Sequence, residues 1–179
     1  MNKPFANKVA LVTGAASAMG LATGQAFAEA GAAVVLADFR KDPVNAEAQK
    51  LTAAGHKAIA FGCDVSDDAQ VAAMVDWTVA QFGRLDAAFN NAGVMARIAP
   101  TADSTREEWD RVIGINLRGV WSCPLRASCA SGSLFDSCVS FERFSLVGGS
   151  DGWFPDGDHG PVLLIPGHSD AKWIHWKRK

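Results

Sequence analysis

The sequence predicts an α/β fold, in which a parallel sheet carries helices on both faces. Apolar runs of strand length alternate with longer alanine-rich stretches, as repeated strand–helix units do. Polar residues follow these stretches at intervals of 25, 26, 27 and 25 positions, at Thr13, Asp38, Asp64, Asn91 and Asn116. Because the carboxyl ends of parallel strands share one edge of the sheet, these polar residues are expected to converge there.

The first two strand–helix units have clear end signals. Gly31 and Gly55 follow the alanine-rich stretches, and glycine is favoured just past the end of a helix. Pro43 suits the first turn of the second helix. The elements expected are strand 8–12, helix 18–30, strand 33–37 and helix 44–54.

The next two units follow the same plan. Ser66 suits the N-cap of a helix that Gly83 ends, and Ser104 suits the N-cap of a last helix. The elements expected are strand 57–61, helix 67–82, strand 85–89 and a helix after Ser104. The apolar positions of that last helix recur at helical spacing, at Trp109, Val112, Ile113, Leu117 and Val120.

The composition changes sharply about two thirds of the way along the chain. Residues 1–120 contain 28 alanines and 3 serines, whereas residues 121–179 contain 3 alanines and 9 serines. The predicted organisation is an α/β domain at 1–121 and an irregular, atypical tail at 122–179, with strand-like apolar runs at 145–147 and 162–165.

Composition and charge favour a globular cytoplasmic protein. The net charge is only −2, so no basic surface favours nucleic acid. The apolar runs at 9–12 and 32–37 are too short for a signal-peptide core or a membrane helix, so neither is expected. The four cysteines are expected to be free thiols, and their spacing from the histidines at 159, 168 and 175 disfavours a metal site.

A glycine-rich turn, residues 13–20, lies between the first strand and the first helix. Gly14 and Gly20 leave room for a pyrophosphate to approach backbone N–H groups and the positive end of the helix. Asp38 follows Gly20 by 18 positions and can accept hydrogen bonds from ribose hydroxyls. Its charge would repel a 2′-phosphate, which favours NAD over NADP, although nearby Arg40 keeps NADP open. The alternatives are a purely structural glycine turn and an aspartate that opens a turn.

These motifs resemble those of the short-chain dehydrogenase/reductases. The glycine motif of that family, T-G-x-x-x-G-x-G, is similar to residues 13–20, its adenine-side Asp-Val to Asp64 and Val65, and its N-N-A-G turn to residues 90–93. The resemblance implies a Rossmann-like fold and an oxidoreductase. Such an enzyme moves hydride between a nicotinamide dinucleotide and a small alcohol or carbonyl compound.

The resemblance also implies roles for single residues. The expected cofactor-binding residues are Gly14, Ser17, Met19 and Gly20 at the pyrophosphate, Asp64 and Val65 at the adenine, and Asn91, Ala92 and Gly93 beside the ribose on the nicotinamide side. Asn116 resembles a helix asparagine that supports a proton-relay water and is the expected catalytic residue. The structural alternatives are that Asp64 terminates a strand and that Asn116 satisfies backbone groups at a helix irregularity.

Two departures from the family pattern bear on the chemistry. Ala18 replaces the middle glycine of the motif, and we expect weakened or locally shifted binding rather than loss, because alanine suits a helix start. The chain has no tyrosine, whereas the family transfers a proton through a Tyr-x-x-x-Lys pair. His168 keeps that spacing to Lys172, but the Pro-Gly pair before it argues against a helix there.

The sequence therefore favours an NAD(H)-binding oxidoreductase that is impaired in proton transfer. The alternative is a non-catalytic nucleotide-binding or partner-binding module, such as a truncated isoform. The expected strand order 3-2-1-4 leaves the fourth strand at an edge through which the chain can self-associate. A further hypothesis is that the tail arises from a shifted reading frame, a retained intron or an alternative exon.

Overall fold

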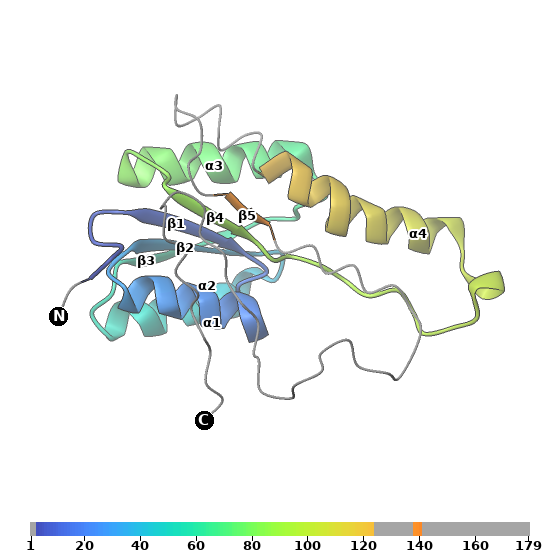
Figure 1. Ribbon diagram of the computed structural model, residues 1–179, viewed down its shortest axis with the longest axis horizontal. Helices are drawn as coiled ribbons and strands as arrows, with labels where there is room; N and C mark the ends of the chain where they lie inside the picture. Colours follow the sequence, from blue (N-terminus) through green and yellow to red (C-terminus); the bar gives the residue numbers. More distant parts are fainter. Residues whose placement is uncertain (1–2, 124–137, 141–179) are drawn as a thin grey trace, which may run out of the picture.

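The computed structural model describes residues 3–123 and 138–140. Their strands are parallel and form one sheet in the order β3-β2-β1-β4-β5 (Figure 1). The strands are β1 (Val9–Thr13), β2 (Ala33–Asp38), β3 (Ala58–Gly62), β4 (Ala87–Asn90) and β5 (Cys138–Ser140). The Rossmann-like α/β class and the order of the first four strands are therefore confirmed.

Helices cover both faces of the sheet, with α1 and α2 on one side and α3 on the other (Figure 1). Their bounds are α1 (Ala18–Glu29), α2 (Lys41–Ala53), α3 (Asp68–Phe82) and α4 (Arg106–Ile113). A 3₁₀ turn, η1 (Thr101–Asp103), precedes α4, and a π-helical segment, η2 (Gly114–Gly119), follows it. These bounds agree closely with the expected ones, but the π segment was not expected.

Alternate residues of the central strand β1 pack into two separate cores. Ala10 and Val12 lie in the core that α1 and α2 cover, whereas Leu11 lies in the core beneath α3. All residues of β1 and β2 are buried, which is typical of parallel strands covered on both faces. Burial on both faces fixes the strands, so the residues at their carboxyl ends have defined positions.

The caps of two helices differ from those expected. Asp67, and not Ser66, is the N-cap of α3, and its carboxylate accepts hydrogen bonds from the N–H groups of Ala69 and Gln70. Thr105, and not Ser104, is the N-cap of α4. Both shifts have the same cause, because two adjacent residues in each turn have a suitable side chain and only one is in register with the free N–H groups.

The fourth strand is not at an edge of the sheet, which corrects the expectation. β5 pairs in parallel with β4, in the register Ala88 to Cys138 and Asn90 to Ser140. The strand has only three residues, Cys-Val-Ser, which is too short for an alternation of apolar and polar residues to be recognised. The two apolar runs that were expected to be strand-like, 145–147 and 162–165, lie outside the described residues.

The last helix differs from the others in its burial. No residue of α4 is buried, and its apolar residue Trp109 is 63% exposed. Leu117 in η2 and Trp121 beyond it are also exposed. The helical spacing of the apolar residues thus predicted a helix correctly. Within the described residues, however, these apolar side chains do not form a face that is buried in the core. Along these residues, no helix has both the length and the apolar character needed to cross a bilayer.

Candidate functional site

A cleft of about 1210 Å³ opens at the carboxyl ends of the strands. It brings together nearly all of the residues singled out from the sequence, namely Gly14, Ser17, Met19, Asp38, Asp64, Val65, Asn91, Ala92, Gly93 and Asn116. Gly20 does not line the cleft, because it is buried behind the glycine turn. The expected convergence of the strand ends is therefore confirmed.

The first and last glycines of the glycine-rich turn, Gly14 and Gly20, allow the turn to pack tightly. Gly14 has a φ of +65°, a conformation that favours glycine. A Cβ atom at Gly20 would lie 2.2 Å from the carbonyl oxygen of Gly14 and 2.7 Å from Nδ2 of Asn91. Gly20 therefore permits close packing of α1 against the end of β1. Its contact with a pyrophosphate stays a prediction.

Ala18 occupies a left-handed conformation, with a φ of +49°. Alanine is strained there by roughly 1–2 kcal/mol relative to right-handed backbone. The argument that alanine suits a helix start is thus wrong for this position, because the residue enters α1 with a backbone conformation that glycine adopts more easily. Ala18 is exposed and lines the cleft, so its methyl group also narrows the place where a pyrophosphate would lie.

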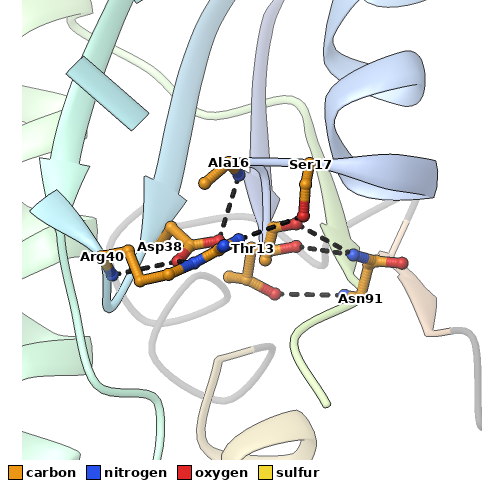
Figure 2. Close-up of polar contacts among 7 residues, drawn as sticks. Thr13, Ala16, Ser17, Asp38, Arg40 and Asn91 are labelled. Carbon is orange, nitrogen blue, oxygen red and sulfur yellow. Dashed lines mark hydrogen bonds and ion pairs between the residues drawn. The ribbon is translucent and has the colours of Figure 1, made fainter. Parts of the chain in front are cut away.

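Thr13 and Asn91 tie the end of β4 to the glycine turn (Figure 2). The Oγ1 atom of Thr13 accepts hydrogen bonds from the N–H groups of Asn91 and Ala92, each at 3.1 Å. In return, Nδ2 of Asn91 donates to the carbonyl oxygens of Thr13 at 3.1 Å and Gly14 at 3.3 Å. Thr13 was recognised only as a strand end, although its position next to the first glycine was the signal that could have identified its role.

Asp38 is buried at the end of β2 and accepts three hydrogen bonds (Figure 2). Its Oδ2 atom accepts from the N–H of Ala16 at 3.0 Å. Its Oδ1 atom accepts from the backbone N–H of Arg40 at 3.0 Å and from Nε of Arg40 at 3.2 Å. The Nη2 atom of Arg40 also donates to Oγ of Ser17 at 3.0 Å. A buried carboxylate is stabilised by such donors, and the guanidinium balances its charge.

Asp64 and Val65 lie just beyond β3 and form the next part of the cleft wall. The Oδ1 atom of Asp64 accepts from the N–H of Ser66 at 2.9 Å and from its Oγ at 2.7 Å. Val65 packs against Gly119 of η2, where a Cβ would lie 2.9 Å from Cγ2 of Val65. Burial, followed by the charges of Asp64 and Asp67, raises the pKa of the adjacent Cys63 thiol to about 12. This thiol is therefore not a nucleophile at neutral pH.

Asn116 lies in the π-helical segment and holds the loop that follows β4. Its Oδ1 atom accepts from the N–H of Val94, and its Nδ2 atom donates to the carbonyl oxygen of Val94, both at 2.8 Å. This two-point contact matches the alternative that Asn116 satisfies backbone groups at a helix irregularity. Its role with a proton-relay water stays a prediction.

Another part of the cleft wall comes from the loop that carries residues 94–99, which no sequence motif marked, and residues of α4 and η2 also line it. Met95 and Ile98 are exposed in it, and Ile98 is 92% exposed. Arg111 of α4 donates from Nη2 to the carbonyl oxygen of Met95 at 3.1 Å, and Glu108 accepts from the N–H of Arg97. The loop therefore presents apolar side chains to the cleft while α4 holds its backbone.

Comparison with known proteins agrees with this geometry. The fold matches a solved structure, 3-ketoacyl-(acyl-carrier-protein) reductase from Brucella melitensis complexed with NADH, with a TM-score of 0.65 and 35% sequence identity. That match covers 68% of this chain and 49% of the reductase. Among curated proteins, cis-4-hydroxycyclohexanecarboxylate dehydrogenase from Sinomonas cyclohexanicum is 43% identical over 136 residues, which cover 74% of this chain and 54% of that enzyme.

A second curated relative is the (2S)-[(R)-hydroxy(phenyl)methyl]succinyl-CoA dehydrogenase subunit BbsD from Thauera aromatica, 41% identical over 65% of this chain and 47% of its own length. The chain thus spans about half the length of the curated relatives it matches. The family model for short chain dehydrogenases matches residues 8–128, which is more than half of the chain. With its strand order and its glycine turn facing the cleft, the chain belongs to the short-chain dehydrogenase family of oxidoreductases and has their NAD(P)-binding fold.

Proposed function

We propose that the chain binds NAD(H) in the cleft and that its hydride-transfer chemistry is impaired. One observation carries the binding proposal, which is that the glycine turn, the Asp38 carboxylate and the turn at Asn91 meet at one edge of the sheet. The residues fit a dinucleotide in order. Asp64 and Val65 would lie along the adenine, Asp38 would accept from the adenosine ribose, and the N-terminal turn of α1 would hold the pyrophosphate.

The preference for NAD rests on Asp38. Its carboxylate stands where a 2′-phosphate would lie and opposes that second negative charge, and the Arg40 guanidinium at 3.2 Å balances part of this opposition. At the other end of the cleft, Asn91, Ala92 and Gly93 would hold the ribose on the nicotinamide side. Among the described residues, the hydrogen bonds of Asn91 use its Nδ2 atom and its backbone N–H, so its Oδ1 atom is the group that would accept from this ribose.

The bound cofactor would supply or accept a hydride, with a small alcohol or carbonyl compound as its partner. The reaction also needs a group that exchanges a proton with the substrate oxygen. The chain contains no tyrosine, and among the described residues no histidine or lysine lines the cleft. The Asn116 amide does not titrate and can only orient a water, so we infer slow turnover or none.

Calorimetric titration of the whole chain with NADH, followed by an assay with a panel of carbonyl compounds, tests this proposal. The expected result is saturable binding with turnover near the uncatalysed rate. Asp38→Ala should weaken the binding of NADH, whereas Lys50→Ala, at an exposed ion pair on α2, should not change it. Robust turnover that is lost in His168→Ala would overturn the impairment, and the absence of NADH binding would overturn the proposed function.

A second candidate function follows from the missing tyrosine. A chain that binds NAD without turnover would act as a nucleotide-binding or partner-binding module, as a truncated isoform of a longer enzyme. Self-association through the sheet would then use β5 and not β4, because β4 is covered.

Transcript sequence across the codon for residue 122 tests whether the tail at 122–179 comes from a shifted frame or another exon. The free, buried thiol of Cys63 supports the cytoplasmic location, which stays a prediction.

A further inference from the structure

The π-helical segment η2 contacts two loops of the cleft wall that are far apart in the sequence. Gly119 packs on Val65 in the loop after β3, and Asn116 holds Val94 in the loop after β4. We propose that Gly119 is a positioning residue for the cofactor: through η2, it keeps the adenine end of the cleft in register with the nicotinamide end. The inference rests on the proposed function, because it takes the cofactor to lie in this cleft.

The first step concerns the contact of Gly119, which a larger residue could not make. A Cβ atom at Gly119 would lie 2.9 Å from Cγ2 of Val65 and 2.9 Å from its carbonyl oxygen. Carbon atoms pack at about 3.5–4.0 Å, so a side chain at this position would push the two segments apart. Val65 is buried in the core beneath α3 and has little room to move. Gly119 therefore sets the distance between η2 and the loop expected to contact the adenine.

The second step concerns the π-helical turn itself. In an α-helix, residues five positions apart point about 140° away from each other. In η2, both Gly114 and Gly119 face the loop after β3, since a Cβ atom at Gly114 would lie 3.8 Å from Cβ of Ser66. The wider i→i+5 turn of a π-helix brings two such positions to one face. Asn116 lies between them in the sequence and contacts Val94 instead. The π turn thus lets η2 contact both loops at once.

The third step concerns how firmly η2 is held. The side chain of Asn116 makes two hydrogen bonds with the backbone of Val94, both at 2.8 Å, so a shift of η2 would strain both. Just beyond η2, the buried Ser122 donates from Oγ to Oδ1 of Asp68 in the first turn of α3, at 2.5 Å. Together with the contact of Gly119, these bonds fix the segment at three places. Because packed interiors are nearly incompressible, a displacement at Gly119 is transmitted to Asn116.

Gly119→Ala tests the inference through the dissociation constant of NADH for the whole chain, measured by calorimetry. We expect about tenfold weaker binding or more, because the added methyl group displaces η2 from Val65. Gly114→Ala is the matched control, since it makes the same change in the same segment. Its Cβ would meet the flexible end of Arg118 at 3.2 Å, so binding should change less than about twofold. Equal NADH affinities in Gly119→Ala and Gly114→Ala would overturn the inference.

A double-mutant cycle with Asn116→Ala separates transmission along η2 from a local effect at the adenine. If Gly119 acts through the contact of Asn116 with Val94, the two substitutions are not additive. Gly119→Ala should then weaken NADH binding by no more than about threefold in the Asn116→Ala chain. A full tenfold loss in both backgrounds would show that Gly119 affects the adenine end alone, and this result would overturn the link between the two ends.

A second measurement does not need Gly119→Ala to fold. Val65→Ala shortens the side chain that Gly119 contacts, and without cofactor it should speed amide exchange at Val94 about fivefold relative to the amides of β1. Val44→Ala makes the same truncation in the core on the other face of the sheet and should leave this ratio unchanged. Equal ratios in the two variants would overturn the inference. Failure of the wild-type chain to bind NADH would instead overturn the proposed function.

Discussion

The two halves of the cleft are built differently. On the adenosine side, β1, the glycine turn and β2 are buried, and the polar side chains of Thr13 and Asp38 are each held by several hydrogen bonds. On the opposite side, the loop at 94–99 and α4 carry exposed apolar residues, and α4 has no buried residue. The comparison indicates that, within the described residues, a buried framework holds the residues expected to bind the nucleotide, whereas the half formed by the loop and α4 is exposed and contributes no tyrosine, histidine or lysine to the cleft.

Gly20→Ala is expected to have the largest effect on stability, because it adds a Cβ atom at the tightest contact of the adenosine side. The new Cβ would lie 2.2 Å from a backbone oxygen of Gly14, which has little room to move. We expect a loss of about 3 kcal/mol in the free energy of unfolding, measured by urea denaturation. Gly55→Ala is the control, since Gly55 has nothing within 4 Å of its Cβ position, and it should cost about 1 kcal/mol because the φ of Gly55 is positive. Equal losses in the two variants would contradict the close packing of the turn.

Thr13→Val tests the link between the glycine turn and β4. It removes the acceptor for two partly buried N–H groups, those of Asn91 and Ala92, and should cost about 2 kcal/mol. NADH binding should weaken as well, because the turn at Asn91 loses its anchor. In the control Thr78→Val, the lost hydroxyl donates only to the helix carbonyl of Met74, so a cost below about 1 kcal/mol is expected. An unchanged free energy of unfolding in Thr13→Val would show that this residue does not join the glycine turn to β4.

Ala18→Gly is expected to raise both the stability and the NADH affinity of the adenosine side. Relief of the left-handed strain should raise the free energy of unfolding by about 1 kcal/mol, and removal of the methyl group should tighten NADH binding. Ala22→Gly, within α1, should instead lower stability by about 1 kcal/mol. Thermal melts of both variants with and without NADH provide the measurement. If both substitutions by glycine lower the free energy of unfolding, the backbone of Ala18 is not strained.

The smallest effect is expected on the other half. Trp109→Ser, at an exposed position of α4, should change the free energy of unfolding by less than about 0.5 kcal/mol. Trp77→Ser in α3 is the matched substitution. Trp77 packs against Phe61 with ring centroids 5.2 Å apart, and its loss should cost about 2 kcal/mol or more. If Trp109→Ser lowers the free energy of unfolding as much as Trp77→Ser does, the surface of α4 at Trp109 is covered.

The strand ends could be predicted from the sequence because their signals are local. Buried parallel strands are short apolar runs, and glycine or a polar residue follows each of them. The order of the first four strands followed from the family resemblance. The same local signals placed Gly14, Asp38, Asp64 and Asn91 at one edge of the sheet before any side chain was positioned.

Other features could not be predicted because they depend on tertiary geometry. The φ of Ala18 is set by the turn and not by helix propensity, and the choice of Asp67 over Ser66 as a cap depends on register. The bridge from Arg40 to Ser17 joins residues that are 23 positions apart and needs the strand ends in place. The pairing of β5 with β4 is carried by backbone hydrogen bonds in a segment with no apolar alternation.

Hydrogen exchange of the whole chain with and without NADH tests the central claim most directly. The account predicts that NADH slows amide exchange at residues 14–20 and 91–94, which meet at the cleft, and leaves residues 106–113 of α4 unchanged. Slower exchange confined to α4, or no change at either segment at saturating NADH, would contradict the assignment of nucleotide binding to the glycine turn.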